Sequence, residues 1–489
     1  MQLTDEQTVI VKTARDMAHA GGVLKIAAAA GTGKTTTLFE VAKAITEAHK
    51  GRVLYLAYNR AIVDEARSKF AGVAEVSTLH SLAYREMAIG ALQRPLQNVD
   101  IKTIIELLGL KSDYGLSSYK AARFISNTLT NFCASAADSL SPDLIVPHVR
   151  RRLDAAAQDW IATRSWDLFL ALSPLRRPII KSLPVPHDLY VKVWHLSGTP
   201  GLRDYTTVLL DEAQDANPVI AHAIENARHV VYVGDEHQQI YSFRGAINAM
   251  QRMPGIELPL TQSFRWGPDV AEVANRVLAH KSVPPKWAIR GTAALHTNLA
   301  QVDNSKKHAR LYRANRDLIG DALFLEDMHH PTALVGDRKN FISLIASAKA
   351  LHDGQMRGIK HRALANYDSW EELLEAVESD NDEDVSQDAR QAVSVVRDYG
   401  ARVDDLVGLL ERTQDEASAL VTLTTAHQAK GREWDQVIVC HDFDHILERA
   451  STQEKRDMEY NLLYVAVTRA KRCMELQSDF LRDLMADRL

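Results

Sequence analysis

The stretch AAAAGTGKTTT at residues 27–37 decides the fold of the first part of this chain. It ends an apolar, strand-like run at Val23–Ala30 and opens a helical pattern at Thr35–Lys50. Gly31 and Gly33 allow a tight turn in which successive backbone N–H groups point at one phosphate. This order of strand, glycine-rich loop and helix predicts a phosphate-binding loop.

The residue types that follow the glycines indicate a nucleoside triphosphate with a divalent cation. Lys34 supplies a positive charge for the β- and γ-phosphates, and the hydroxyl of Thr35 suits Mg²⁺. Ala28 stands where the pattern usually has its first glycine. We therefore predict ATP and Mg²⁺ as ligands. The residues expected to surround the nucleotide here are Ala30, Gly31, Thr32, Gly33, Lys34, Thr35 and Thr36.

A second stretch, TTVLLDEAQD at residues 206–215, supplies carboxylates. Its aliphatic and β-branched run ends at Asp211, which should lie at the carboxyl edge of a parallel sheet beside the phosphate loop. Asp211 could then reach Mg²⁺ directly or through water, and Glu212 could act as general base on the attacking water. Gln214 and Asp215 are expected to couple this loop to its neighbours. An ordinary acidic loop after a strand is the alternative, and the GKT loop in the same chain argues against it.

Helical patterns and apolar runs alternate in two regions of the chain, which predicts an α/β fold with parallel sheets. In the first region the helical patterns cover 5–20, 35–50 and 60–70, and the apolar runs cover 23–30, 53–57, 207–210 and 230–233. The second region begins after Arg265, with a helical pattern at 268–280 and apolar runs at 309–312, 333–335 and 436–440. Residues 90–195 are helical in pattern, rich in Pro and locally basic, so we expect a mostly helical insertion in the first region. Residues 368–388 are acidic and mostly helical in pattern.

Composition sets bounds on the protein but does not identify it. Of its 489 residues, 46% are hydrophobic and 25% charged, as in globular proteins with more than one domain. The 58 Lys and Arg residues and the 63 Asp and Glu residues give a net charge of −5, which by itself argues against a nucleic-acid partner.

The cysteines and the absence of long apolar stretches predict the compartment. Cys133, Cys440 and Cys473 lie far apart without a CxxC pair, so we expect neither disulfides nor zinc but small buried side chains. The N-terminus lacks the apolar core of a signal peptide, and no stretch reaches the roughly 18 apolar residues of a membrane span. These features predict a soluble, cytoplasmic protein without membrane contact.

Four further stretches carry motifs in a fixed order: VVYVGDEHQQIYSFRGA (230–246), LPLTQSFRWGPDVAEVAN (258–275), TLTTAHQAKGREWDQVIV (422–439) and NLLYVAVTRAKR (461–472). With Gln7, GTGKT and DEAQD, they resemble the motif set of the UvrD/Rep-type superfamily 1A DNA helicases. The details LTQSFRWGP, AKGREWDQV and PHDLYVKVWHL (186–196) are similar to the helicase region of the F-box DNA helicase family. Because Gln7 lies so near Met1, we expect no F-box upstream.

The resemblance implies two RecA-like P-loop motor domains with parallel sheets, each carrying a mostly helical insertion. The predicted boundaries are 1–89 with 196–265 for the first motor domain, 90–195 for its insertion, 266–344 with 419–489 for the second motor domain, and 345–418 for a reduced second insertion. The resemblance also implies nucleotide contacts outside the loop: adenine reading by Gln7, a γ-phosphate contact by Gln238, stacking by Phe264, a sugar contact by Glu433, and arginine fingers at Arg265 and Arg469.

Polar and aromatic side chains in the same motifs resemble the family's single-strand DNA contacts, which combine backbone contacts with base stacking. They are Tyr58, Asn59, Thr78, His80, Tyr241, Phe243, Arg244, Thr425 and His427. Phe243, between Ser242 and Arg244, suits base stacking, whereas Tyr241 fits the core equally well. Trp266 and Trp434 are expected to pack rather than to contact DNA. Contacts of this kind should depend less steeply on salt than those of a strongly basic protein.

The leading hypothesis is a 3′→5′ DNA helicase, with the polarity implied by the resemblance alone. ATP would bind between the two motor domains, and the substrates would be single-stranded and 3′-tailed duplex DNA, bound by a monomer. Two alternatives remain open. One is a translocase that strips proteins from single strands with little unwinding. The other is a partner-dependent DNA-binding ATPase subunit of a mobile-element or phage-defence system.

Overall fold

A computed structural model of the chain describes residues 2–49, 51–57, 60–240, 250, 253–361, 363–364, 367, 369–378, 385–444, 450 and 452–487. The chain divides into two compact units, Met1–Leu260 and Thr261–Leu489. The sequence had predicted this boundary after Arg265. The segment from Thr261 belongs to the second unit because its backbone pairs there. Ser263 N–H donates to the Arg290 carbonyl at 2.8 Å, and Arg290 N–H donates to the Thr261 carbonyl at 3.0 Å.

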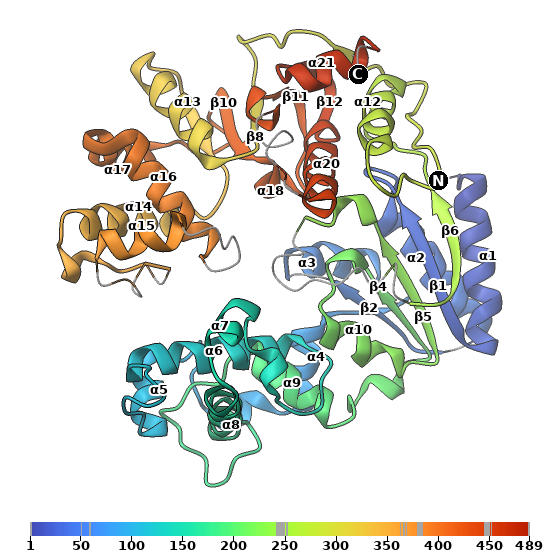
Figure 1. Cartoon of the computed structure of the whole chain (residues 1–489). Coiled ribbons are helices and arrows are strands. Elements are labelled where there is room, and N and C mark those ends of the chain that lie inside the picture. Colours follow the sequence, from blue (N-terminus) through green and yellow to red (C-terminus); the bar gives the residue numbers. More distant parts are fainter. Residues whose placement is uncertain are drawn as a thin grey trace. The chain divides into compact units, whose positions relative to one another are not determined.

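The first unit contains a six-stranded sheet in the order β3-β2-β4-β5-β1-β6 (Figure 1), and every described strand pair in it is parallel. This confirms the predicted α/β fold with a parallel sheet. The strands are β1 (Gly22–Ala28), β2 (Val53–Ala57), β3 (Glu75–Thr78), β4 (Thr207–Leu210), β5 (His229–Gly234) and β6 (Ile256–Leu260). β5 lies between β1 and β4, so the loops that leave all three strands begin at one edge of the sheet.

Alternating strand residues divide the core of the first unit between the two faces of the sheet. On one face, Ile26 and Tyr55 pack in a cluster with residues of α1, α2 and α3. On the other, Leu56 and Leu210 pack with α4, α9 and α10. The bounds are α1 (Asp5–Ala20), α2 (Lys34–His49), α3 (Arg60–Lys69), α4 (Leu79–Glu86), α9 (His187–Leu196) and α10 (Pro218–Glu225). A capping box begins α1, in which Thr4 and Gln7 each satisfy the other's backbone N–H.

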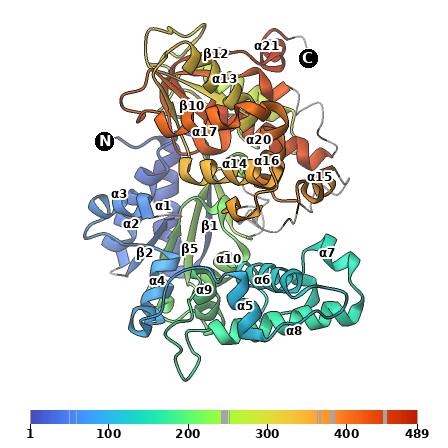
Figure 2. The ribbon, with the colours of Figure 1, turned by 90° about the vertical axis from the view of Figure 1, so that its left-hand side faces the viewer.

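The stretch predicted as a helical insertion in the first unit is helical. Its helices are α5 (Ile101–Leu108), α6 (Ser118–Ala134), α7 (Pro147–Arg152) and α8 (Ala155–Leu172), followed by α9 (Figures 1 and 2). Ile125, Phe132 and Phe169 from these helices belong to the same apolar cluster as Leu56 and Leu210 of the sheet. The insertion therefore shares a core with one face of the sheet and is not a separately packed body.

The second unit contains another six-stranded sheet, in the order β7-β12-β11-β8-β10-β9, again with parallel described pairs. Its strands are β7 (Asn298–Leu299), β8 (His308–Tyr312), β9 (Thr332–Leu334), β10 (Val421–Thr425), β11 (Trp434–Val439) and β12 (Ala470–Leu476). Its helices are α12 (Pro268–Ala279), α13 (Asn315–Asp327), α14 (Arg338–His352), α15 (Trp370–Glu378), α16 (Gln387–Tyr399), α17 (Val403–Arg412), α18 (Ala426–Ala429), α20 (Gln453–Val467) and α21 (Asp479–Met485).

Helices α14 to α17 lie between β9 and β10 in the chain and correspond to the expected second insertion. Because α14 starts at Arg338, the helical segment begins before the predicted position 345. Leu344 of α14 and Val393 of α16 share an apolar cluster with Leu423 of β10, so this insertion too is packed onto the sheet.

Short 3₁₀ turns complete the described fold: η1 (Ile89–Leu92), η2 (Pro142–Leu144), η3 (Leu202–Asp204), η4 (Ala213–Asp215), η5 (Glu236–Gln238), η7 (Met356–Gly358), η8 (Gly400–Arg402) and η9 (His441–Phe443). Cys133 and Cys440 are buried as predicted, but Cys473 is only partly buried. It lies on β12 beside the exposed edge strand β7, which leaves it incompletely covered. None of the described helices is both long and apolar enough to cross a membrane.

Candidate nucleotide and DNA sites

The phosphate loop connects the end of β1 at Ala28 to the start of α2 at Lys34. Gly31 and Gly33 have φ angles of +73° and +77°, a conformation that glycine adopts without strain. Thr32 is fully buried, and its hydroxyl donates to the Ala29 carbonyl at 2.9 Å. The loop is therefore held in shape by its own side chain at the N-terminal end of a long helix, where an anion is favoured.

Lys34 forms an ion pair with Glu212, with 2.7 Å between Nζ and Oε1. The two side chains are 15% and 22% exposed, so the pair is largely shielded from water. Burial alone would lower the pKa of Lys34, but the charges of Glu212, Asp211 and Asp235 outweigh it and raise this pKa above its ordinary value. Lys34 is thus charged at neutral pH, and a phosphate that binds it would compete with Glu212 for its ammonium group.

Asp211 directly follows β4 and is almost completely buried. Its Oδ2 accepts the hydroxyl hydrogen of Tyr55 at 2.6 Å, and its Oδ1 accepts Glu212 N–H at 2.9 Å. Burial and the charge of Glu212 raise the pKa of Asp211, against the opposing effects of Lys34 and Tyr55. A divalent cation beside this carboxylate would relieve the cost of burying its charge.

The donor set suits Mg²⁺, which is usually held by one or two carboxylates together with substrate phosphates and waters. Asp211 provides such a carboxylate, and Thr35 contributes a hydroxyl from the first turn of α2. Within the described ranges, no three His, Cys, Asp or Glu side chains cluster closely enough to hold a metal by themselves. An ion at this position would therefore need the nucleotide as a partner.

Gln214 connects two of the loops at this edge of the sheet. Its Nε2 donates to Glu212 Oε2 at 2.6 Å, and its Oε1 accepts Asp235 N–H at 3.1 Å. A Cβ on Gly234 would lie 2.4 Å from Gln214 Oε1, so only glycine permits this approach. Glu212 itself has a φ of +52°, a conformation that costs a non-glycine residue on the order of 1 kcal/mol. The sequence predicted a coupling role for Gln214, and its side chain bonds to Glu212 of its own loop and to Asp235 of the loop after β5.

Gln238 and Gln7 are held by different elements of the first unit. Gln238 is nearly buried, and its Nε2 donates to Asp235 Oδ2 at 2.6 Å. Gln7, on α1, accepts Thr4 N–H through Oε1 at 3.0 Å and donates through Nε2 to Thr37 at 3.1 Å. Gln7 is thus tied to the first turns of α2, immediately after the loop. Of the other predicted loop residues, Thr36 accepts a hydrogen bond from Lys69 at 2.9 Å.

Arg265 and Glu433 meet within the second unit, although 168 residues separate them in the chain. Arg265 Nε donates to Glu433 Oε2 at 2.6 Å, and its NH1 donates to the Thr468 carbonyl at 3.2 Å. Phe264, the residue before Arg265, has 43% of its surface exposed, so its ring is accessible for stacking. The structure therefore brings together a predicted arginine finger and the predicted sugar contact.

Arg469, the other predicted finger, is only 1% exposed. Its guanidinium donates to the Val465 carbonyl at 2.8 Å, the Arg432 carbonyl at 3.2 Å and the Thr468 hydroxyl at 2.8 Å. In this conformation it holds the end of α20 against the loop before β11. Trp266 is fully buried, which confirms its predicted packing role, and the partly buried Trp434 donates to Glu416 at 2.7 Å.

The predicted DNA contacts are described only in part, because Tyr58, Asn59, Tyr241, Phe243 and Arg244 lie outside the described residues. Among the others, Thr78 and Thr425 occupy equivalent positions in the two units. Each ends a strand, and each side chain caps the helix that follows, α4 or α18. His80, on α4, contacts Asp188 Oδ1 at 3.2 Å. His427 lies within α18.

Two residues of the site were missed by the sequence analysis. Tyr55 stands in the middle of VLYLA, where its hydroxyl reaches Asp211, directly after the next strand. Asp235 accepts a hydrogen bond from Gln238 on its carboxylate and donates its own N–H to Gln214. The available signal for Tyr55 was a polar-tipped side chain in an otherwise aliphatic buried strand. For Asp235 it was the position directly after β5, at the same sheet edge as Asp211.

Comparisons with known proteins agree with this geometry. A family model described as an AAA domain matches residues 11–244, and one described as the UvrD-like helicase C-terminal domain matches residues 372–477. F-box DNA helicase protein 1 of Schizosaccharomyces pombe is 31% identical over 96% of this chain and 57% of its own length. F-box DNA helicase 1 of Gallus gallus is 29% identical over 99% of this chain and 50% of its own length.

A bacterial relative has a shorter match. ATP-dependent DNA helicase UvrD2 of Mycobacterium tuberculosis is 25% identical over 55% of this chain and 46% of its own length. The chain thus spans about half the length of the curated relatives it matches. The two family models and the alignments over nearly the whole chain show that it belongs to the UvrD-like helicases and is similar to their F-box helicase members.

Proposed function

We propose that this chain is an ATP-driven DNA helicase that moves 3′→5′ on single-stranded DNA and separates duplex strands. The observation that carries the proposal is the constellation of Lys34, Glu212 and Asp211 at the carboxyl edge of the first sheet, behind a glycine loop. It occurs in a chain that aligns over nearly its whole length with proteins named as DNA helicases. The polarity rests on the family resemblance.

ATP binding would release the general base. In the described conformation, Glu212 is held by Lys34 on one oxygen and by Gln214 on the other. When the γ-phosphate takes Lys34, the first oxygen becomes free to accept a proton from the attacking water. Asp211 and Thr35 would hold Mg²⁺, which neutralises charge on the β- and γ-phosphates when bound. Gln238 bonds to Asp235, which in turn bonds to Gln214. A contact between Gln238 and the γ-phosphate would therefore be linked to the loop that carries Glu212.

The second unit would contribute the remaining nucleotide contacts. Arg265 and Glu433 satisfy each other in the described state, so both would exchange partners when nucleotide arrives. Phe264 would stack on adenine. Thr78, His80, Thr425 and His427, with the predicted contacts outside the described residues, would bind the single strand. We propose that a monomer acts on single-stranded and 3′-tailed duplex DNA.

The deciding experiment is strand displacement by the purified chain on matched duplexes with a 3′ or a 5′ single-stranded tail. ATP-dependent unwinding of the 3′-tailed duplex alone is the expected result. Unwinding of only the 5′-tailed duplex would overturn the polarity. Rapid DNA-stimulated ATP hydrolysis without unwinding would replace the helicase proposal by protein stripping or partner-dependent action.

A pair of lysine variants on one helix tests the site itself. Lys34→Ala should abolish DNA-stimulated ATP hydrolysis, since it removes the cation that faces the β- and γ-phosphates. Lys43→Ala, an exposed position on the same helix α2, should leave hydrolysis unchanged. Full turnover by the Lys34 variant would show that the nucleotide site lies elsewhere.

A further inference from the structure

The helical insertion of the first unit carries a groove that the nucleotide and DNA assignments do not use. It has a volume of about 480 Å³ and lies between the C-terminal half of α8, the loop that follows and the C-terminal end of α9. Phe169 and Val193 form its buried floor, and Leu196 forms part of its wall. This volume falls within the roughly 300–1,000 Å³ typical of ligand pockets.

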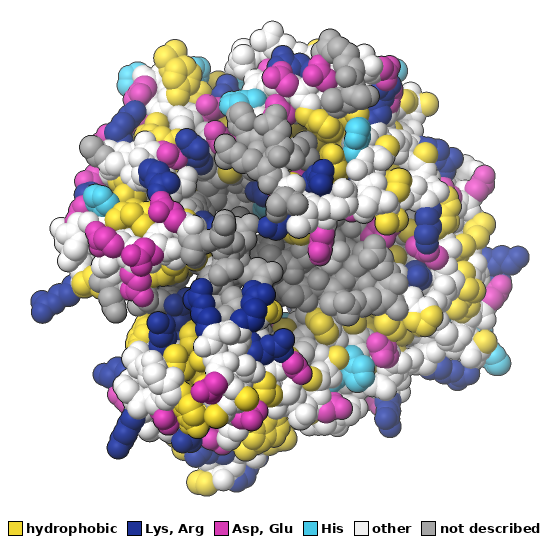
Figure 3. All heavy atoms as spheres, in the orientation of Figure 1, with side chains coloured by type: hydrophobic (Ala, Val, Ile, Leu, Met, Phe, Trp, Pro, Cys, Tyr) yellow, Lys and Arg dark blue, Asp and Glu magenta, His cyan; other side chains and the backbone are white. Residues whose placement is uncertain are grey.

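Large apolar side chains surround the groove and remain in contact with water. Leu170 is 48% exposed and Leu175 is 57% exposed, and both line the groove. Ile179, in the same loop, is 38% exposed. Contiguous exposed apolar surface is uncommon on soluble domains and marks sites where another molecule packs. Figure 3 shows hydrophobic side chains among basic and acidic ones on the visible surface of the insertion.

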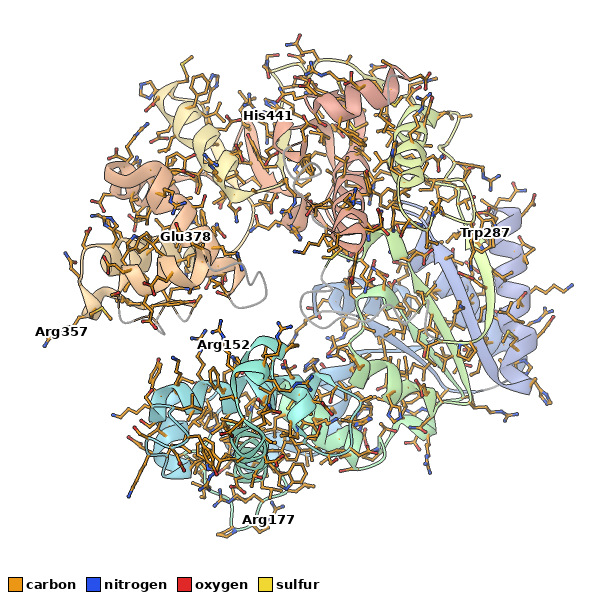
Figure 4. The ribbon with its side chains drawn as sticks, in the orientation of Figure 1. Arg152, Arg177, Trp287, Arg357, Glu378 and His441 are labelled. Atoms are coloured by element: carbon orange, nitrogen blue, oxygen red, sulfur yellow. The ribbon has the colours of Figure 1, made fainter. Side chains whose placement is uncertain are left out.

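The groove is also electropositive. Arg176 and Arg177 line it, and residues 168–187 contain no Asp or Glu. Arg176 donates to the Ala171 carbonyl at 3.1 Å, and Arg177 to the Pro174 carbonyl at 3.1 Å. Neither guanidinium forms an ion pair with a carboxylate in the part of the chain that the structure describes. Arg177 lies at the outer edge of the insertion, on the loop after α8 (Figure 4).

A third arginine holds the loop in place from beneath. Arg94 is buried and donates to four backbone carbonyls, those of Leu172, Ser173, Leu183 and Pro184, at 2.8–3.0 Å. It thereby ties the end of α8 to the segment that leads into α9. Burial and the nearby charge of Arg176 lower the pKa of Arg94, in keeping with an uncompensated positive region. The groove is thus preformed, which reduces the entropy lost when a ligand binds.

We propose that this groove docks a short peptide segment of a partner protein, in which a bulky aliphatic or aromatic side chain stands next to Asp or Glu residues. The apolar side chain would fill the space over Phe169 and Val193 and cover Leu175. The carboxylates would pair with Arg176 and Arg177, for which guanidinium geometry allows two parallel bonds. A nucleic-acid backbone fits less well, because DNA-binding surfaces are more polar and carry denser positive charge than this one.

Selection from a displayed library of random 12-residue peptides tests the proposal on the full chain. The library is panned on the wild-type protein after depletion on Leu175→Glu, which places a charge on the apolar rim. The expected result is enrichment of sequences with a large apolar residue beside Asp or Glu. Enrichment of basic or uncharged sequences, or of none, would overturn the proposal.

Fluorescence anisotropy with one selected peptide then tests each feature of the groove. Arg176→Glu combined with Arg177→Glu should weaken binding at least tenfold, as should Leu175→Glu. The control for charge is Lys111→Glu with Lys120→Glu, two exposed lysines of the same insertion that do not line the groove, and the control for an exposed leucine is Leu96→Glu. Both controls should bind like the wild type.

The same variants separate peptide docking from DNA binding and from misfolding. Their circular dichroism, DNA-stimulated ATP hydrolysis and affinity for a single-stranded oligonucleotide should match those of the wild type. If the arginine pair is needed for oligonucleotide binding but not for peptide binding, the groove is a nucleic-acid site and the proposal is wrong. ATP hydrolysis and peptide binding are measured in separate assays. A chain that fails to hydrolyse ATP can therefore still be tested for peptide binding.

Discussion

Tyr55→Phe removes a single hydroxyl from the centre of the proposed nucleotide site. That hydroxyl donates to Asp211 Oδ2 at 2.6 Å, and Tyr55 is fully buried. Its ring packs against Phe70, with 4.6 Å between the ring centroids, so phenylalanine can occupy the same volume. The substitution therefore changes the hydrogen bonding of the proposed Mg²⁺ ligand with little change in packing.

Two independent estimates give the size of the expected loss. A hydrogen bond to a charged group contributes about 1.5–3 kcal/mol net. Removal of an outer partner of a metal ligand typically lowers metal affinity or activity about 10–100-fold, and each tenfold corresponds to about 1.4 kcal/mol. We therefore expect the Mg²⁺ concentration for half-maximal ATP hydrolysis to rise by about tenfold or more. The lost bond also raises the pKa of Asp211, so the acid limb of the pH–rate profile should move to higher pH.

The control is Tyr232→Phe on strand β5 of the same sheet. Tyr232 is buried, and its hydroxyl has no hydrogen-bond partner among the described residues, so its removal should leave Mg²⁺ dependence unchanged. The assay is DNA-stimulated ATP hydrolysis titrated with Mg²⁺ at fixed ATP, repeated across pH. Wild-type Mg²⁺ dependence in Tyr55→Phe, or equal impairment in both variants, would refute the positioning role of Tyr55.

Three further predictions concern other contacts. Gln214→Met removes the bonds to Glu212 and Asp235, so steady-state kinetics should show kcat for ATP falling about tenfold or more, with a smaller change in KM; an unchanged kcat would contradict the coupling role. Burial, with the charges of Lys192 and His222, lowers the pKa of His195 to about 4. The unfolded chain therefore takes up a proton on His195 between pH 6.5 and 4 that the folded chain does not. As the pH is lowered from 6.5 to 4, the free energy of unfolding should therefore decrease by up to about 3 kcal/mol. Urea denaturation at several pH values should show a smaller decrease for His195→Gln than for the wild type. Finally, single-strand affinity should fall only gently with salt, and a slope that requires many phosphate neutralisations would contradict stacking and polar contacts as the main source of binding.

The local elements of the fold could be predicted from the sequence because their signals are local. The strand Val53–Ala57 coincides with its predicted bounds, and α2 begins within one residue of its predicted start. The first strand was predicted to end at Ala30 but ends at Ala28. A run of four alanines has no periodicity that separates strand from loop. Ala29 still donates its N–H to the Leu260 carbonyl at 3.0 Å, so hydrogen bonding between β1 and β6 continues one residue beyond the end of the strand.

The connections within the site could not be predicted, because they join distant parts of the chain. Tyr55 and Asp211 are 156 residues apart, and Arg265 and Glu433 are 168 apart. Hydrophobic periodicity reports the face on which a side chain lies, but not the loop that it meets. The motifs identified three of the four groups that meet in these two bonds, namely Asp211, Arg265 and Glu433. It did not indicate that Arg265 and Glu433 satisfy each other in the described state.

The two predicted arginine fingers differ physically in a way that their motifs do not reveal. Arg265 pairs with Glu433, and the two side chains are 17% and 43% exposed. Phosphate oxygens could therefore take the place of the Glu433 carboxylate as the anionic partner of Arg265. Arg469 is buried, and its guanidinium donates to the Val465 and Arg432 carbonyls and to the Thr468 hydroxyl. If it left them, those acceptors would be stranded at about 1–3 kcal/mol for each buried group. Arg265 therefore needs only an exchange of partners to act on a nucleotide, whereas Arg469 needs a rearrangement of the segment that joins α20 to β12. The described conformation directly supports a structural role for Arg469, in which its side chain braces that segment.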